Sequence, residues 1–168
     1  MGVRSDYQAG YFYGRVGKTP VIPATGQRFS CNMISTIINR GKLCFKLFTQ
    51  RFDSTVMLDF LRRLVRQSEQ KIFLIVDGHP VHRSRAVHQW LVKHQDRIRL
   101  FFLPAYSPEL NPDELLNHDV KANVVGRQRA KHKTEMIDNI RSYLRSTQRQ
   151  PTIVQNFFRE KHVAYSAA

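Results

Sequence analysis

A run of five apolar residues, Ile72–Val76, constrains the fold of this chain more than any other feature of its sequence. Such a continuous run, rich in β-branched residues, is typical of a strand buried on both faces inside a parallel or mixed sheet. An amphipathic stretch with Val87, Trp90 and Leu91 on one face follows it, and a second apolar run, Ile98–Leu103, then predicts another buried strand. Strand, helix and strand in this order predict a right-handed parallel crossover, and therefore an α/β fold.

The segments around this unit predict a hairpin and further helices. Two β-forming runs, Met33–Ile38 and Leu43–Phe48, flank four turn residues, a spacing that fits an antiparallel hairpin. Asp53 is placed to cap a helix with apolar residues at helical spacing (Met57, Phe60, Leu61, Leu64 and Val65). Apolar residues at helical spacing indicate two more amphipathic helices, one with Met136, Ile137, Ile140, Tyr143 and Leu144 and a last one with Ile153, Val154, Phe157 and Phe158. Residues 1–29 predict turns and short extended pieces.

The composition limits the class of protein. At 168 residues and 42% hydrophobic content, the chain is long enough for one domain, residues 1–168, with a real core. It lacks the roughly 18 to 20 consecutive apolar residues that a membrane span needs, so we expect a soluble, intracellular protein with no membrane partner. Lys and Arg total 27 against 13 acidic residues, and the resulting net charge of +14 predicts a nucleic acid partner.

Two carboxylates are placed where an α/β fold gathers its functional groups. Asp77 follows the first buried run, at the carboxyl end of a predicted strand, although an Asp-Gly turn alone would also explain it. Glu114 lies near the start of the helix after the second run, where it could instead complete a capping box with Asn111. If the crossover brings the two together, they could share a hard divalent cation such as Mg²⁺.

Two other groups of residues could bind ligands. Asp77, His79 and His82 together suit a transition metal such as Zn²⁺, but Pro80 argues against a regular helix that would present both imidazoles on one face. Basic residues alternate through a polar stretch that predicts either a phosphate-binding loop or a solvated one: Arg127, Arg129, Lys131 and Lys133.

Two motifs resemble one known family. The run 73–82, Phe-Leu-Ile-Val-Asp-Gly-His-Pro-Val-His, and the run 102–114, Phe-Leu-Pro-Ala-Tyr-Ser-Pro-Glu-Leu-Asn-Pro-Asp-Glu, resemble the DDE endonuclease domain of mariner-like bacterial insertion-sequence transposases. The second run is the more specific. The resemblance implies an RNase H-like mixed sheet flanked by helices, with Asp77 and Glu114 as the second and third catalytic carboxylates, binding Mg²⁺ or Mn²⁺. It also suggests that His79 and Asn111 orient these ligands.

The reaction implied by the resemblance is cleavage of DNA strands and their transfer to target DNA, by a homodimer in the bacterial cytoplasm. The family's first carboxylate ends an N-terminal strand that this sequence lacks, together with the upstream helix-turn-helix modules, and Asp6 follows no buried run that would make it a substitute. We therefore expect weak or absent catalysis by this chain alone. The alternative is a non-catalytic, basic DNA-binding remnant of a transposase.

Overall fold

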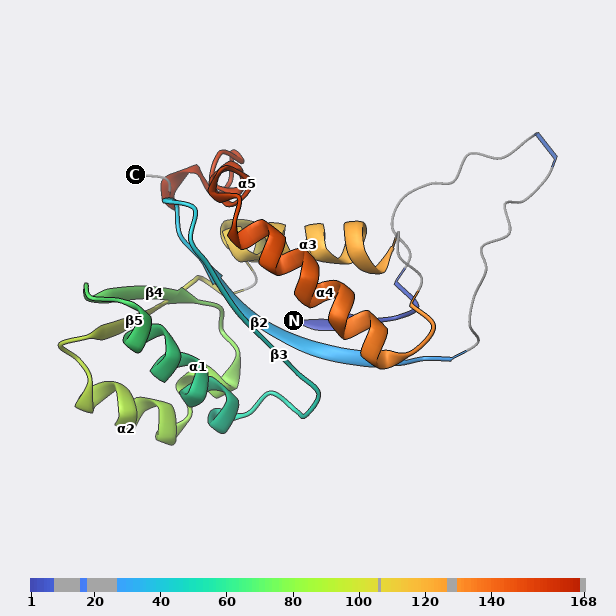
Figure 1. Ribbon diagram of the computed structural model, residues 1–168. Coiled ribbons are helices and arrows are strands. Elements are labelled where there is room, and N and C mark those ends of the chain that lie inside the picture. The colour runs from blue at the N-terminus through green and yellow to red at the C-terminus, as the bar shows by residue number, and fades with distance from the viewer. Residues whose placement is uncertain (8–15, 18–26, 106, 127–129, 167–168) are drawn as a thin grey trace.

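The strands of this chain form two sheets. The computed structural model describes residues 1–7, 16–17, 27–105, 107–126 and 130–166 (Figure 1). The first sheet is antiparallel, in the order β1-β2-β3, and the second is a parallel pair, β4 and β5. The strands are β1 (Gly2–Arg4), β2 (Ser30–Ile37), β3 (Leu43–Phe48), β4 (Ile72–Val76) and β5 (Ile98–Phe102).

The predicted hairpin is confirmed. β2 and β3 pair from Asn32 opposite Phe48 to Ile37 opposite Leu43. The turn between them closes through a hydrogen bond from the Gly41 N–H to the Ile38 carbonyl, and Gly41 has a φ of 86°, which only glycine adopts at little cost. The N-terminal segment, predicted as turns and short extended pieces, contains the short strand β1, which pairs antiparallel with β2 over three residues.

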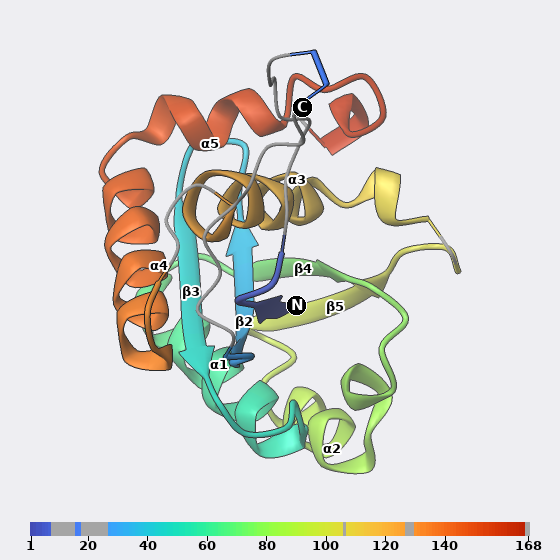
Figure 2. The ribbon, with the colours of Figure 1, turned by 90° about the vertical axis from the view of Figure 1, so that its right-hand side faces the viewer.

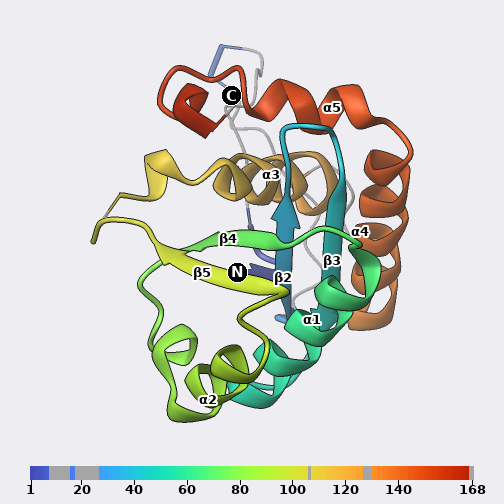
Figure 3. The same cartoon turned by 90° about the vertical axis from the view of Figure 1, so that its left-hand side faces the viewer.

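The helices lie on two sides of these sheets. They are α1 (Ser54–Gln67), α2 (Arg85–Lys93), α3 (Pro112–Val120), α4 (Lys133–Gln148) and α5 (Pro151–Phe157). Helices α3, α4 and α5 lie against the β1-β2-β3 sheet, and α1 and α2 lie beside β4 and β5 (Figures 2 and 3). Asp53 caps α1 by accepting a hydrogen bond from the Val56 N–H at 2.9 Å, as predicted. None of the helices in the described ranges is long and apolar enough to cross a membrane.

Each helical layer buries its own apolar core. One cluster joins the antiparallel sheet to α3, α4 and α5, with Met33, Leu116 and Ile140 among its fully buried members. The other joins α1 and α2 to β4 and β5 around Phe60 and Leu61. Ile34 of β2 packs against this second cluster, and Arg63 of α1 donates a hydrogen bond to the Phe45 carbonyl of β3. Helix α1 therefore connects the two sheets.

The prediction that β4 and β5 are buried on both faces is wrong. Leu74 and Val76 face α1 and are buried, but Phe73 is 64% exposed and Ile75 is 47% exposed. On β5 only Ile98 is buried, and Phe101 lies beside Phe73 on the exposed face. The apolar pattern of a strand does not record which elements pack on its two faces, and here α1 and α2 cover the face of β4 that carries Leu74 and Val76.

Two strand edges remain open within the described part of the chain. Met1 extends the β1 pairing by exchanging two hydrogen bonds of 2.8 Å with Met33, and no described residue pairs with β2 on that side beyond this point. The alternation of an antiparallel ladder then directs the N–H groups of Ser35 and Ile37 to this edge. Strand β4 pairs with β5 on one side only. In Figures 2 and 3 the N-terminus lies beside β2, on the side of β4.

Candidate active site

Asp77 follows the last residue of β4 and is held by two neighbours from the turn after it. Its Oδ1 accepts a hydrogen bond from the His79 N–H at 3.0 Å and lies 3.1 Å from Nδ1 of His82. The hydrogen bond with His82, against the opposing effect of burial and with help from the His79 N–H, lowers the pKa of Asp77 to about 2. The carboxylate is therefore ionised at neutral pH, while its side chain stays 58% exposed at the end of the strand.

The transition-metal alternative is not supported by the geometry of the two histidines. Nδ1 of His79 accepts a hydrogen bond from the Val81 N–H, and Nδ1 of His82 contacts Asp77. The two rings pack on Phe52, with ring centroids 5.1 and 5.8 Å away. Burial lowers the pKa of His79. Within the described ranges, no three His, Cys, Asp or Glu side chains are grouped so as to form the transition-metal site that Asp77, His79 and His82 would make together.

Glu114 lies in the first turn of α3, at the position predicted from the sequence. Asn111 caps this helix by accepting a hydrogen bond from the Asp113 N–H at 3.1 Å, and Pro112 takes the first helical position. The capping box that could have explained Glu114 does not form, because the Asn111 N–H donates to the Pro108 carbonyl instead. Glu114 is exposed, so its carboxylate is accessible to a ligand.

Asp113 is a third acid at this place that sequence reasoning missed. Its Oδ2 accepts a hydrogen bond from Ser35 of β2 at 2.8 Å, and its Oδ1 is sealed from solvent without a hydrogen-bond partner, although the residue as a whole is half-buried. Burial, opposed by the Ser35 hydrogen bond and helped by the charges of Glu114 and Asp77, raises the pKa of Asp113 to about 6.

The carboxyl end of β4 lies on the same side of the molecule as the start of α3 (Figures 2 and 3), and the charge of Asp77, like that of the adjacent Glu114, raises the pKa of Asp113. A signal for Asp113 was present in the sequence. It shares one helical face with the buried Leu116 and Val120, three and seven residues later. Asp113 is therefore an acidic residue at a position of α3 where an apolar one is expected, and a polar residue at a core position often has a specific role.

The basic residues predicted to bind phosphate are only partly described. Lys131 and Lys133 are exposed at the start of α4, and the backbone N–H of Lys131 donates to Glu135 at 2.7 Å. Arg127 and Arg129 lie outside the described residues. The two lysines are accessible to a polyanion, and their role in DNA binding stays a prediction.

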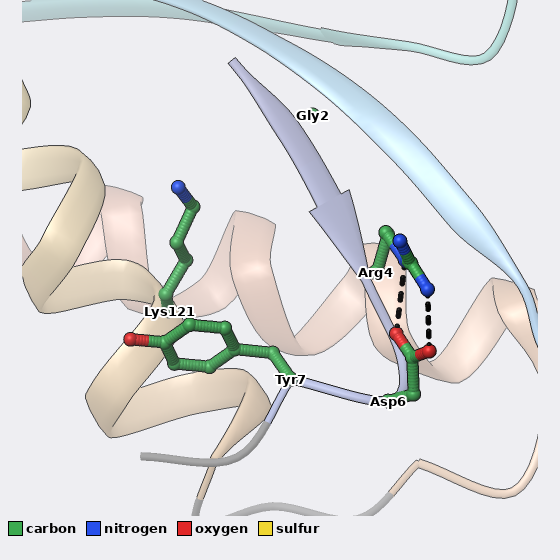
Figure 4. A pocket seen from close by; sticks show the side chains of 5 residues that line it. All are labelled: Gly2, Arg4, Asp6, Tyr7 and Lys121. Carbon is green, nitrogen blue, oxygen red and sulfur yellow. Dashed lines mark hydrogen bonds and ion pairs between the residues drawn. The ribbon is translucent and has the colours of Figure 1, made fainter.

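Asp6 lies in a different environment from the two predicted carboxylates. It forms a two-pronged ion pair with Arg4, with contacts of 3.0 and 2.6 Å (Figure 4). The pair lines a pocket with Gly2, Tyr7 and Lys121, and neither Asp77 nor Glu114 is part of that lining. The hydrogen bond from Arg4 lowers the pKa of Asp6. Asp6 is thus a surface ion-pair partner, consistent with the sequence argument against it as a substitute carboxylate.

The architecture is that of the RNase H-like α/β domains, with one acid at the carboxyl end of β4 and another on the helix after β5. The chain belongs to the family described as DDE superfamily endonuclease, whose model matches residues 1–137. No curated protein matches the sequence.

Solved structures of one transposase share this fold. The Mos1 mariner paired end complex with Mn is 15% identical with a TM-score of 0.65, and the match covers 100% of this chain and 54% of that one. The catalytic domain of Mos1 mariner transposase is 14% identical with a TM-score of 0.54, covering 82% of this chain and 80% of that one. A structure of the Mos1 catalytic domain and Raltegravir with Mn is 16% identical with a TM-score of 0.56, covering 83% and 76%. This chain therefore spans about half the length of the transposase in the paired end complex.

Proposed function

We propose that this chain is the catalytic domain of a cut-and-paste DNA transposase of the bacterial insertion-sequence type. In this proposal Asp77 and Glu114 bind Mg²⁺ or Mn²⁺ for the cleavage and transfer of DNA strands. The observation that carries the proposal is that the carboxyl end of β4, which Asp77 follows, and the first turn of α3, which holds Glu114, lie on the same side of a chain of the DDE superfamily. The Mos1 structures with Mg or Mn support the choice of metal.

The chemistry of the donor set fits a hard divalent cation. Among the described residues, both hydrogen bonds to the Asp77 carboxylate reach Oδ1, which leaves Oδ2 to a ligand, and Glu114 is exposed. Such cations take a few carboxylate oxygens and keep waters for a phosphate. When bound, the metal supplies activation of the attacking oxygen and stabilisation of the leaving one. The protein's part is to hold both carboxylates in place, and we propose that His79 and Asn111 help by fixing the turns that carry them.

We also propose that the first carboxylate comes from a strand between β2 and β4. The open edges of these two strands support this, since a strand there would pair with both. A residue directly opposite Ser35 would have its side chain on the same face as Ser35, which points to Asp113 and the start of α3. An acid at that position would approach Glu114. Without it we expect this chain to bind the metal weakly and to cleave slowly.

Calorimetric titration with Mn²⁺ tests the proposal. We would compare this chain, its Asp77→Asn and Glu114→Gln variants, and a version extended upstream by its native coding sequence. Asp96→Asn is the control, because Asp96 is exposed in the turn between α2 and β5. Binding should strengthen on extension, disappear in both site variants and persist in the control. An extended protein that binds no divalent cation would refute the catalytic role.

The basic charge supports a second candidate, the non-catalytic DNA-binding remnant. The net charge of +14 and the exposed Lys131 and Lys133 suit a phosphate backbone with or without a working metal site. Binding of duplex DNA should weaken steeply with salt in either case, and the slope of log K against log salt should fall by about 1 for each lysine replaced by Gln. Cleavage that depends on Mn²⁺ separates the transposase from the remnant.

We propose, finally, that the protein acts as a homodimer on paired DNA ends. The Mos1 mariner paired end complex, in which a protein of similar fold was crystallised, supports this arrangement. Light scattering after size exclusion, with and without DNA that carries the element's ends, measures the state directly. A complex with one protein chain on each isolated DNA end would refute the pairing.

A further inference from the structure

His82 is a buried polar side chain that the proposed function does not yet use. It lies on the short 3₁₀ turn Pro80–Arg83 and is 9% exposed. Its Nδ1 is 3.1 Å from Oδ1 of Asp77 and 3.2 Å from the Asp77 backbone carbonyl oxygen. Both neighbours are hydrogen-bond acceptors, so the nitrogen between them must carry a proton. His82 therefore donates to Asp77.

Packing fixes the His82 ring in this position. The ring meets Phe52 edge to face with centroids 5.8 Å apart, and the His82 N–H donates to the His79 carbonyl at 3.0 Å. Phe52 immediately precedes the capping residue of α1, so the ring rests against the start of that helix. Asp77, by contrast, is 58% exposed and has little packing of its own to select one rotamer. The rigid partner of this pair is the histidine.

The two donors converge on one oxygen of the carboxylate. Oδ1 of Asp77 receives hydrogen bonds from His82 and from the His79 N–H, which leaves Oδ2 as the oxygen without a donor among the described residues. We propose that His82 is a positioning residue that locks the Asp77 side chain so that Oδ2 alone is presented to a divalent cation. The inference rests on the proposed metal-binding function and adds the residue that orients its ligand. Partners that orient metal ligands in this way typically change metal affinity 10- to 100-fold when removed.

Two substitutions separate the hydrogen bond from the packing. His82→Phe keeps a ring against Phe52 but removes the donor, whereas His82→Asn offers an amide N–H near the position of Nδ1 but loses ring contacts. His88→Ala is the control, because His88 is exposed on the neighbouring helix α2. Each variant is titrated with Mn²⁺ by calorimetry in this chain and in its upstream-extended version, and each is melted to measure Tm.

If His82 is a positioning residue, the two variants should rank in opposite order by Tm and by affinity for Mn²⁺. His82→Phe should keep a Tm close to that of the wild type but bind Mn²⁺ roughly 10- to 100-fold more weakly, while His82→Asn should melt lower and bind within about 3-fold of the wild type. Wild-type affinity in His82→Phe would overturn the positioning role and leave the metal site standing. A wild type that binds no Mn²⁺ even when extended would overturn the metal-binding function itself.

The hydrogen bond can also be checked without any metal. A long-range ¹H–¹⁵N correlation spectrum reports which ring nitrogen of a histidine is protonated. His82 should show a protonated Nδ1, and the pattern should change in Asp77→Asn. A neutral His82 ring protonated only at Nε2 would overturn the inference whatever the calorimetry shows.

Discussion

Replacement of Asp113 by Asn should stabilise this domain at neutral pH. The carboxyl group has its pKa raised from 3.8 to about 6, first by burial, because Oδ1 is shielded from solvent without a partner. In the Asn variant, the amide oxygen can still accept the hydrogen bond from Ser35, and the uncharged amide nitrogen takes the place of Oδ1. The substitution therefore removes an unfavourable ionisation and keeps the shape of the side chain.

The magnitude and the pH window follow from this shift. Between pH 3.8 and about 6 the folded protein holds a proton on Asp113 that the unfolded chain has released, so the free energy of unfolding falls as pH rises through this window. The full shift corresponds to a loss of about 3 kcal/mol above pH 6. For a domain of this size, recovery of that energy would raise Tm by roughly 6 to 12 °C. At pH 3.5, where Asp113 is protonated in both states, Asn should bring almost no gain.

Thermal and urea denaturation at pH 3.5, 5 and 7.5, in EDTA to exclude divalent cations, measure this effect. Asp96→Asn is the matched control, since Asp96 is exposed and the same charge is removed. An Asp113→Asn variant that is no more stable than the wild type at pH 7.5, or that gains equally at pH 3.5, would show that burial of this carboxylate carries no ionisation penalty.

Three further substitutions test the packing that positions the site. Asp53→Ala removes the acceptor of the Val56 N–H and should lower the free energy of unfolding by about 1 kcal/mol in urea denaturation. Asp53→Asn keeps an acceptor at this position and should retain most of the wild-type stability. Leu61→Ala opens a cavity at a fully buried position and should lower it by roughly 2 to 5 kcal/mol; a loss below about 1 kcal/mol would contradict the assignment of Leu61 to the core. Gly41→Ala forces a side chain into a φ of 86° and to within 2.5 Å of Pro151 Cβ, so Tm should fall by several degrees, and an unchanged Tm would argue against this turn.

Local physical chemistry allowed much of the secondary structure to be predicted from the sequence. The hairpin, the Asp53 and Asn111 caps and the crossover between β4 and β5 depend on residues close together in the chain, and each was confirmed. The placement of Asp77 at a strand end and of Glu114 in a first helical turn followed from the same patterns. Their roles as metal ligands came from the resemblance to a transposase family and stay predictions.

Contacts between distant segments decided what the sequence could not. Phe73 and Ile75 are exposed because they face away from the core that β4 forms with α1 and α2, and the apolar pattern of a strand does not record which elements pack on its two faces. The burial of Asp113 depends on Ser35, 78 positions away in the chain.

The contact between His82 and Asp77 shows how the two kinds of information combine. The sequence places both residues in one turn, but which ring nitrogen faces the carboxylate is set by packing on Phe52, which belongs to another segment of the chain. Sequence periodicity reports which side chains can be buried together within one element. Tertiary structure alone determines which elements meet, and therefore which polar atoms are desolvated, paired or left open to a ligand.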